Sequence, residues 1–461
     1  MLDSLLSYYG VINRMSDIWW TRQLGPSWLK TLRQSRLESL VRYAISYSTY
    51  YRALYSNISA KNIRIEDLPV VTKSELMQSF DDWVTDNYVK RLDIDTFLAN
   101  LDLIGSLYQN RFAVWKSSGS TGEPGIFLHD KDALATYDAL IGNQLNSGNI
   151  FSRYLSGLSY KKGRFALVVA MEGHFASISS WQRLIDQYPW VDNRSFSIMT
   201  PLMDLTTQLN DYQPNFIASY PTMLTQLMEQ KEKGILKISP QLIWSGGESL
   251  TDAAQKHIQQ VFNCPVINEY GASECLSIGC SCKEGRLHLN ADWVILEAVD
   301  KHYQPVGPGE ISYTSLLTNL TNRIQPIIRY DLGDRIKYFS EACPCGNTLA
   351  SFLVEGRKND VLRLVSSNNS IVEVLPLTLS TMLEEIAGVY RFQIIQTGKS
   401  SLALRIENID NHNEFTSKKA CKILKNFFKS QGLDNVKVTI DRLNPIVDAC
   451  SGKLKEVVCL S

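Results

Sequence analysis

Short β-rich runs alternate with helical patterns through the middle of the chain, and this alternation restricts the fold more than any other feature of the sequence. Between Phe112 and about Leu353 the strand-like runs cover residues 165–171, 216–219, 242–244 and 266–267, and the helical patterns between them cover 181–187, 223–231 and 252–262. Such alternation is typical of βαβ crossovers, in which helices cover a parallel sheet. The sequence therefore predicts an α/β fold with mainly parallel sheets covered by helices.

The regions on either side of this middle part have a different character. In the first hundred residues, apolar residues follow helical spacing over 35–51, and Thr72 to Glu75 form a capping box before a helical stretch at 76–83. The last hundred residues carry strand patterns at 391–396, 402–406 and 436–440, with one helix over 416–431 that ends at Gly432. We expect a large N-terminal domain, 1–356, and a small mobile C-terminal α+β domain, 357–461.

Composition excludes several classes of protein. The chain has 461 residues, which exceeds the roughly 150 residues of an average domain about threefold, so two or three domains are expected. It carries 47 Lys and Arg against 47 Asp and Glu, and 44% of its residues are hydrophobic. A disordered chain is thereby excluded. A neutral chain also lacks the basic excess that phosphate-backbone contacts require, so no nucleic-acid partner is expected.

The sequence gives no sign of export or of membrane association. Its first ten residues have neither a basic segment nor a sustained apolar stretch, so they do not resemble a signal peptide. The apolar run at 165–171 is far shorter than the roughly 20 residues that span a bilayer, and it suits a buried strand. We therefore expect a cytoplasmic protein without a membrane partner.

A loop rich in glycine and hydroxyl residues follows the strand-like run at 112–115. Residues 117–125, SSGSTGEPG, contain three glycines and four hydroxyl side chains in nine positions. Glycine lets the backbone approach an anion closely, and hydroxyls with exposed amides donate to phosphate oxygens. The Gly-Lys-Ser/Thr ending of a Walker A loop is absent. The loop favours phosphate binding, although a flexible surface loop would have the same composition.

Four further motifs later in the chain support the phosphate-binding interpretation of this loop. They are 268–274 (NEYGASE), 330–335 (YDLGDR), Gly356-Arg357 and 451–455 (SGKLK). Together with the loop, their types and order resemble the adenylate-forming superfamily of acyl-CoA synthetases, nonribosomal adenylation domains and luciferases, and most of all its phenylacetate-CoA ligase-like branch. The resemblance runs from about Leu68 to the C-terminus. It implies ATP-dependent activation of a carboxylic acid to an acyl-adenylate.

The resemblance also implies a set of residues that bind ATP and Mg²⁺. The loop would hold the β- and γ-phosphates, Glu274 would ligate Mg²⁺, Tyr270 would lie against the adenine, Asp334 would accept hydrogen bonds from the ribose hydroxyls, and Arg357 would bind the nucleotide near the hinge. The loop residues in this set are Ser117, Ser118, Gly119, Ser120, Thr121 and Gly122. Gly246, Gly247 and Glu248 would border the adenine pocket.

Two residues are expected to act at the reacting carboxylate. Lys453 would reach from the small domain to the carboxylate and the α-phosphate, and would place positive charge where negative charge develops. His174 follows a strand, where the family often has an aromatic or His side chain between the acyl pocket and the phosphates, although a lone His is often only structural. The acid pocket would draw on Tyr220, Pro221, Ser245, Gly271 and Ala272, which do not identify the acid.

The cysteines give a second, independent signal. Nine cysteines is an odd number, and Cys282, His288, Cys343 and Cys345 offer three thiolates and one imidazole, a set suited to tetrahedral Zn²⁺. A comparable zinc knuckle occurs in the phenylacetate-CoA ligase-like branch. We expect a structural zinc ion, with Cys280 and Cys275 as alternative ligands if His288 does not bind. The alternative is a set of reduced, buried cysteines.

The acceptor of the acyl group is the least determined part of this hypothesis. The family usually has an acidic residue two positions after the hinge-region Arg, where this chain has Asn359, and the Gly that commonly follows has no clear counterpart in 361–368. We expect transfer to coenzyme A; the alternatives are a carrier-protein thiol or an amine. The alternative to an enzyme is a zinc-stabilised nucleotide-binding protein without turnover. A homodimer stays an open expectation.

Overall fold

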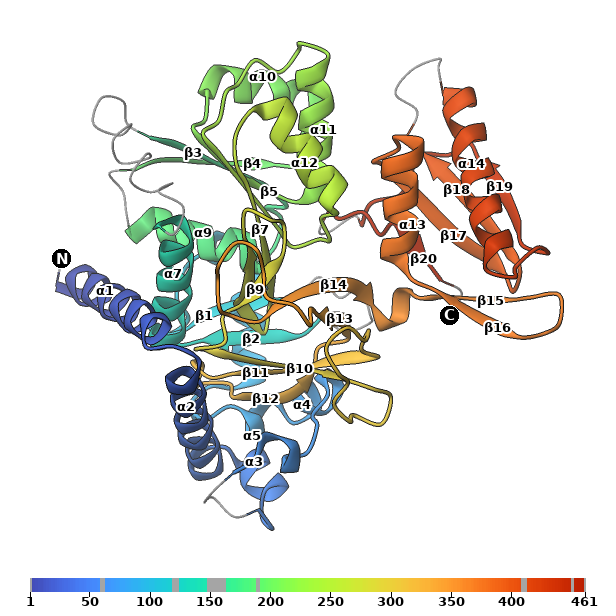
Figure 1. Ribbon diagram of the computed structural model, residues 1–461. Coiled ribbons are helices and arrows are strands. Elements are labelled where there is room, and N and C mark those ends of the chain that lie inside the picture. Colours follow the sequence, from blue (N-terminus) through green and yellow to red (C-terminus); the bar gives the residue numbers. More distant parts are fainter. Residues whose placement is uncertain are drawn as a thin grey trace.

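A nine-stranded sheet forms the centre of the computed structural model, which describes residues 2–58, 63–117, 124–146, 163–187, 191–407, 413–448 and 452–459 (Figure 1). The strands lie in the order β13-β14-β9-β8-β7-β6-β5-β3-β4. Neighbours from β4 to β7 are parallel, and neighbours from β7 to β13 are antiparallel. The bounds are β3 (Arg164–Val169), β4 (Asp192–Ser197), β5 (Phe216–Ser219), β6 (Leu242–Gly246), β7 (Val266–Ala272), β8 (Cys275–Ser281), β9 (Leu287–Leu289), β13 (Asp334–Tyr338) and β14 (Ser351–Arg357).

The predicted α/β class is confirmed, and the structure adds an antiparallel half to the sheet. The alternating pattern identified four of the five parallel strands, β3, β5, β6 and β7, and missed β4. A helix after each of β3, β4, β5 and β6 returns the chain to the other end of the sheet. The antiparallel half begins where β7 turns into β8 over two residues, Ser273 and Glu274. A connection this short fits only antiparallel neighbours.

Helices cover both faces of the parallel strands. On one face, alternate side chains of β3, β5 and β6 pack against α10, α11 and α12 in one buried apolar cluster. On the other face, the remaining side chains of these strands pack against α9, with α7 at the edge. The bounds are α7 (Lys131–Asn146), α9 (Ala176–Gln187), α10 (Leu202–Tyr212), α11 (Pro221–Glu232) and α12 (Asp252–Phe262).

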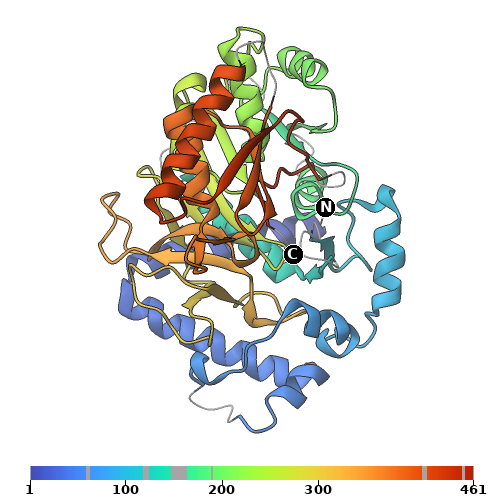
Figure 2. The same cartoon turned by 90° about the vertical axis from the view of Figure 1, so that its right-hand side faces the viewer.

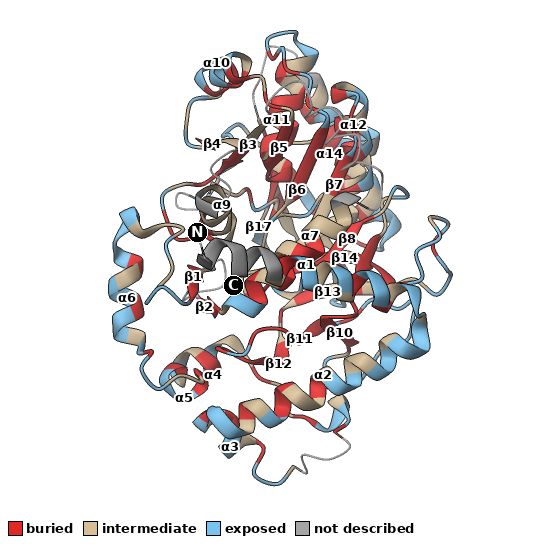
Figure 3. Cartoon of the chain, turned by 90° about the vertical axis from the view of Figure 1, so that its left-hand side faces the viewer, coloured by how far each residue is buried: buried red, intermediate tan, exposed pale blue. Residues whose placement is uncertain are grey.

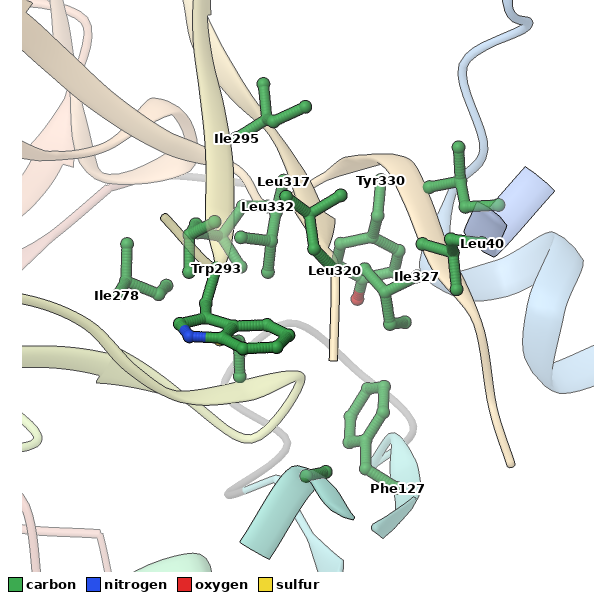
Figure 4. Close-up of a cluster of buried hydrophobic side chains, with 14 of the residues drawn as sticks. Leu40, Phe127, Ile278, Trp293, Ile295, Leu317, Leu320, Ile327, Tyr330 and Leu332 are labelled. Atoms are coloured by element: carbon green, nitrogen blue, oxygen red, sulfur yellow. The ribbon is translucent and has the colours of Figure 1, made fainter. Parts of the chain in front are cut away.

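Helices α2 to α5 lie in the lower part of the molecule in Figure 1, and α1 lies at the left beside α7. They share a buried core with a three-stranded antiparallel sheet, β10-β11-β12, and with the β1-β2 hairpin (Figure 4). Figure 3 shows α2 with one buried and one exposed face, as expected of a surface helix. The bounds are α1 (Leu2–Gln23), α2 (Pro26–Tyr47), α3 (Thr49–Leu54), α4 (Lys73–Gln78), α5 (Phe80–Trp83), α6 (Arg91–Ala99), β1 (Ala113–Lys116), β2 (Ile126–His129), β10 (Val294–Val299), β11 (Thr314–Asn319) and β12 (Ile327–Asp331).

Two helical stretches that the sequence predicted as continuous are broken. The pattern over 35–51 divides at Ser48, whose hydroxyl accepts a hydrogen bond from the Tyr51 amide and so begins α3. The stretch after the Thr72 capping box divides at Ser79, and the box itself is present, with both reciprocal hydrogen bonds. Serine competes for backbone hydrogen bonds and so favours helix starts over helix interiors.

The chain after Leu362 packs around a buried cluster of its own (Figure 2). A four-stranded sheet, in the order β19-β18-β17-β20, lies against α13 and α14, next to the β15-β16 hairpin. Helix α14 ends before Gly432, whose φ of +73° suits glycine at a helix C-terminus. The bounds are β15 (Leu362–Val365), β16 (Ile371–Val374), α13 (Pro376–Met382), β17 (Phe392–Gly398), β18 (Ser401–Ile406), α14 (Asn413–Ser430), β19 (Lys437–Asp441) and β20 (Val457–Val458).

Within the described residues, every helix is too short or too polar to span a bilayer.

Candidate active site

A cavity of about 530 Å³ opens where the parallel strands β3, β5, β6 and β7 end. The carboxyl ends of parallel strands meet at one edge of a sheet, where α/β proteins commonly bind ligands. Residues from the antiparallel half of the sheet and from the C-terminal unit complete its walls. The cavity therefore lies where segments far apart in the sequence meet.

Two groups of side chains line this cavity. The first group is mainly apolar and belongs to the face of the parallel strands that α9 covers; it includes Leu167, Val169, Phe175, Trp181, Leu184, Phe216, Ala218, Tyr220 and Trp244. The second group is polar and comes largely from the segments before α4, after β1 and around β12 to β14; it includes Thr72, Lys73, Ser74, Lys116, Ser117, Glu274, Tyr330, Asp331, Asp334, Arg357 and Lys358. The cavity can thus hold an apolar group beside a strongly polar one.

Asp334 and Arg357 face each other across β13 and β14. They are paired in register, and Arg357 Nε lies 3.3 Å from Asp334 Oδ1. The Tyr270 hydroxyl donates to the other oxygen, Asp334 Oδ2, at 2.6 Å. Asp334 and Arg357 line the cavity, whereas Tyr270 is not among the lining residues. Since each carboxylate oxygen has two lone pairs, Asp334 can still accept hydrogen bonds from a ligand.

Glu274 presents a buried carboxylate to the cavity from the β7–β8 turn. The Tyr330 hydroxyl donates to Glu274 Oε1 at 2.6 Å, and the Glu274 main-chain oxygen accepts from Asn319. Burial raises the pKa of Glu274 above its usual value, against the opposing effect of the Tyr330 hydroxyl. A divalent cation would stabilise the ionised form, and a carboxylate oxygen is a ligand that Mg²⁺ prefers.

Lys453 reaches the cavity from the C-terminal unit. Its ammonium group donates to the Gly247 main-chain oxygen at 2.7 Å and lies 5.0 Å from the centre of the Tyr220 ring. Gly452 makes this approach sterically feasible: its φ is +62°, and a Cβ there would come within 2.1 Å of Ile198 Cδ1. Burial lowers the pKa of Lys453, and the nearby Glu248 carboxylate opposes this shift.

Several predicted site residues lie behind the cavity wall instead of lining it. Glu248 accepts hydrogen bonds from the amide and hydroxyl of Thr222, near the start of α11. Pro221 occupies the first turn of that helix, and Ser245 is fully buried in β6. By contrast Gly246, Gly247, Gly271 and Ala272 line the cavity, as does Tyr220.

The structure does not bring His174 to the cavity. Its side chain is 1% exposed, its Nε2 lies 2.9 Å from the Asn100 main-chain oxygen, and its ring packs against Phe97. Burial lowers the pKa of His174, so the neutral form is favoured. These contacts are those of a structural histidine.

Of the six loop residues predicted to bind phosphate, Ser117 is the one within the described part of the chain. Ser117 lines the cavity, and its hydroxyl accepts a hydrogen bond from the Gly125 amide at 2.8 Å. Ser118, Gly119, Ser120, Thr121 and Gly122 lie outside the described residues. Ser117 and Gly125 fix both ends of the loop beside the polar group of the lining.

Sequence analysis missed four charged residues of the polar group: Lys73, Lys116, Asp331 and Lys358. Lys358 Nζ forms an ion pair with Asp331 Oδ2 at 2.6 Å, and Thr314 donates to the other Asp331 oxygen. Asp331 belongs to the 330–335 motif that was singled out for Asp334, and Lys358 directly follows Arg357. The apolar residues of α9, including Trp181, gave no such signal, because only the fold brings that helix to the strand ends.

The four predicted metal ligands come together in the antiparallel half of the sheet, around β9. The ligand atoms of Cys282, His288, Cys343 and Cys345 all lie within 4.8 Å of one another. Cys282 follows β8, His288 belongs to β9, and the other two lie in the β13–β14 connection. Cys275 and Cys280, the alternative ligands, are buried and are not part of this group.

The distances within this group match tetrahedral zinc. With Zn–S bonds of about 2.3 Å, two thiolate ligands lie about 3.8 Å apart. The Cys282 and Cys343 sulfurs are 3.7 Å apart, and Cys345 Sγ lies 3.4 Å from His288 Nε2. His288 Nδ1 lies 2.9 Å from the Leu349 main-chain oxygen, an orientation that leaves Nε2 as the ligand atom.

Comparisons with known proteins find similar sequences among AMP-binding enzymes. A family model for AMP-binding enzymes matches residues 195–315. The phenylacetate-coenzyme A ligase of Thermus thermophilus is 23% identical over 382 residues, 80% of this chain and 79% of that protein. Protein CapK of Staphylococcus aureus is 24% identical over 357 residues, 72% of this chain and 68% of that protein.

The fold is shared with a solved ligase in two states. The structure of 2-hydroxyisobutyryl-CoA ligase in the postadenylation state, in complex with 2-HIB-AMP, has a TM-score of 0.66 at 17% identity and covers 93% of this chain and 88% of its own. The same ligase in the thioesterification state, in complex with 2-HIB-AMP and CoA, has a TM-score of 0.53 at 18% identity, with coverage of 93% and 89%. The sequence matches and the shared fold together confirm the resemblance of this chain to the adenylate-forming superfamily of AMP-binding enzymes.

Proposed function

We propose that this protein activates a carboxylic acid with ATP, forming an acyl-adenylate and pyrophosphate, and then transfers the acyl group to coenzyme A. The observation that carries the proposal is the convergence of Glu274, Asp334, Arg357 and Lys453 on one cavity that also has an apolar wall. The names of two relatives, a phenylacetate-coenzyme A ligase and a 2-hydroxyisobutyryl-CoA ligase, support the same class of reaction.

The first step needs positive charge and donors around the phosphates. A carboxylate oxygen of the acid attacks the α-phosphorus, and the bond to pyrophosphate breaks, so negative charge grows on the phosphoryl oxygens. Lys453 and Arg357 would stabilise that charge, and Asp334 would hold the ribose hydroxyls. Glu274 would bind Mg²⁺, which neutralises charge on phosphate oxygens when it is bound. The apolar group of lining residues would receive the acid.

The second step calls for a change in the position of Lys453. We propose two domains, 1–356 and 357–461, because the buried cluster after Leu362 is separate from those of the preceding chain. The short helical turn Lys358–Asp360 joins them, and Lys455 forms an ion pair with Asp360 at 2.6 Å. Rotation about this turn would withdraw Lys453 and admit the acceptor.

We propose a structural role for the cysteine group. Three thiolates and one imidazole fill a tetrahedral zinc site and leave no vacant position for a substrate. The site would tie β8 and β9 to the β13–β14 connection. It would thereby fix β13, which carries Asp334, and β8, which pairs with the strand that carries Tyr270.

Exchange of ³²P between pyrophosphate and ATP, driven by a panel of aromatic and aliphatic acids, tests the first step. Acid-dependent exchange supports adenylation; ATP binding without exchange for any acid favours a nucleotide-binding protein without turnover. Acid-dependent consumption of coenzyme A then tests the second step. Exchange without that consumption would contradict the thioester and favour a carrier-protein or amine acceptor.

A further inference from the structure

One carboxylate in the apolar part of the cavity has no role in the proposed adenylation. Glu269 lies on β7, opposite Gly246 of β6, and both residues line the cavity. Trp244, which hydrogen-bonds to Glu269, lines the cavity too, together with apolar residues of β3 and β5. Since side chains alternate along a strand, Glu269 points to the opposite face of the sheet from Tyr270, which reaches Asp334.

The hydrogen bonds of Glu269 are incomplete. The Trp244 indole donates to Oε2 at 2.8 Å, and the Ser277 side chain lies close enough to favour the ionised form, but Oε1 is buried and accepts no hydrogen bond of good geometry. Burial raises the pKa of Glu269 to about 7, and the Trp244 and Ser277 side chains oppose this shift. Among the described residues, no lysine or arginine contributes to the shift or forms an ion pair with this carboxylate. Its charge is therefore not balanced by the protein.

A buried carboxylate in this state is a strong acceptor. Burying an ionised group without a partner is costly, and a ligand that donates to it recovers part of that cost. Hydrogen bonds to charged groups contribute more than neutral ones, so a donor at this position discriminates between ligands of equal shape. A carboxylic acid whose remaining part is only hydrocarbon would supply no hydrogen-bond donor to the Glu269 carboxylate.

We propose that the acid bound in this cavity carries an amino group, and that Glu269 is the residue that selects it. The inference rests on the proposed adenylation and narrows its substrate class to amino-substituted carboxylic acids. An ammonium group matches best, because it supplies both the missing donor and the missing positive charge. The substrate's own carboxylate would lie beside Lys453, at the polar group of the lining.

Matched pairs of acids test this inference. Each pair has the same shape and differs by an amino group in place of a methyl group: 4-aminobutanoate with pentanoate, and 4-aminobenzoate with 4-methylbenzoate. We expect the wild type to favour the amino member of at least one pair at least tenfold, both in kcat/KM for pyrophosphate exchange and in affinity by calorimetry. Equal affinities within both pairs, or a preference for the methyl members, would overturn the proposal.

Two variants connect the preference to the carboxylate. Glu269→Gln keeps the shape of the side chain and removes the charge, and Glu269→Leu removes all polar atoms; both should lower the amino preference at least tenfold. Glu355→Gln is the matched control, since Glu355 is a buried glutamate on β14 that does not line the cavity. A preference that survives both Glu269 substitutions in proteins with normal circular dichroism would refute the role of Glu269.

Calorimetry separates this inference from the proposed function. It measures acid binding without any turnover. An amino preference in affinity, lost in the Glu269 variants, supports the inference even if no acid drives exchange, and the missing exchange would then count against adenylation alone. Exchange that is equally fast with both members of each pair, at equal affinity, supports adenylation and refutes the inference.

Discussion

Replacement of Lys453 by alanine is the sharpest test of the proposed first step. In the structure the ammonium group donates one hydrogen bond, to the Gly247 oxygen, and an ammonium has three N–H donors in all. Two donors therefore stay free for the carboxylate and the α-phosphate of bound substrates. Asp334 and Arg357, which are proposed to bind ATP, are held by contacts with each other and with Tyr270 and not by a hydrogen bond from Lys453. ATP binding should therefore persist in the variant.

The size of the effect follows from the charge that is lost. A unit charge about 4 Å from the developing negative charge, at an effective dielectric constant of about 20, contributes roughly 4 kcal/mol. Losses measured for comparable transition-state donors are about 3 to 4 kcal/mol. Each 1.4 kcal/mol is about tenfold in rate, so Lys453→Ala should slow acid-dependent pyrophosphate exchange by about 10² to 10³.

The assay compares three proteins. Exchange rate and ATP affinity are measured for the wild type, for Lys453→Ala and for Lys437→Ala, a control in which an exposed lysine of the same C-terminal unit is removed from β19. The control should match the wild type within about twofold. If Lys453→Ala also exchanges at the wild-type rate, or if it loses ATP binding to the same extent as exchange, Lys453 does not stabilise the transition state.

Three further predictions concern the metal group, the nucleotide and the response to acid. Cys343→Ser should release zinc, measured by atomic emission, and lower the melting temperature; a wild type that contains no zinc would contradict the site. Asp334→Ala should weaken ATP far more than acid in calorimetry, and equal losses would exclude a role at the ribose. His129 is fully buried, its Nε2 lies 3.0 Å from the Ser273 oxygen, and burial lowers its pKa to about 3. Below about pH 6.5 the unfolded chain binds a proton that the folded protein does not bind until about pH 3, so this residue lowers the unfolding free energy by up to ~1.4 kcal/mol per pH unit as the pH falls. Urea unfolding between pH 6.5 and 4.5 should give a shallower pH slope for His129→Gln than for the wild type, and identical slopes would show that His129 does not contribute.

Local patterns identified most of the elements that build the parallel half of the sheet, although they missed β4 and α10. The apolar run at 216–219 and the helical pattern at 252–262 coincide with β5 and α12. Both signals are properties of short windows of sequence, because period and turn residues act within a few positions. The same windows missed β8, β9 and β14 in the antiparallel half, where the strands are joined by turns and connections without a helical pattern.

Sequence motifs predicted part of the cavity lining, but they did not decide which motif residues face the cavity. Motifs predicted Glu274, Asp334, Arg357 and Lys453, and all four line the cavity. Ser245 belongs to the same motif as Gly246 but points to the other face of β6, since neighbouring side chains of a strand alternate. Strand register therefore decides which members of a motif meet a ligand, and register depends on pairing with distant strands.

The sequence by itself determined the α/β class, the resemblance to the adenylate-forming superfamily and the three cysteines and one histidine that come together, because each depends on residue types in a fixed order. Only the tertiary structure decided that His174 lies outside the cavity, that Trp181 and Glu269 lie on its lining, and that Lys453 reaches Gly247 from the other end of the chain. These are distances between segments up to hundreds of residues apart. They are set by how the layers pack around buried clusters, and no local pattern encodes that packing.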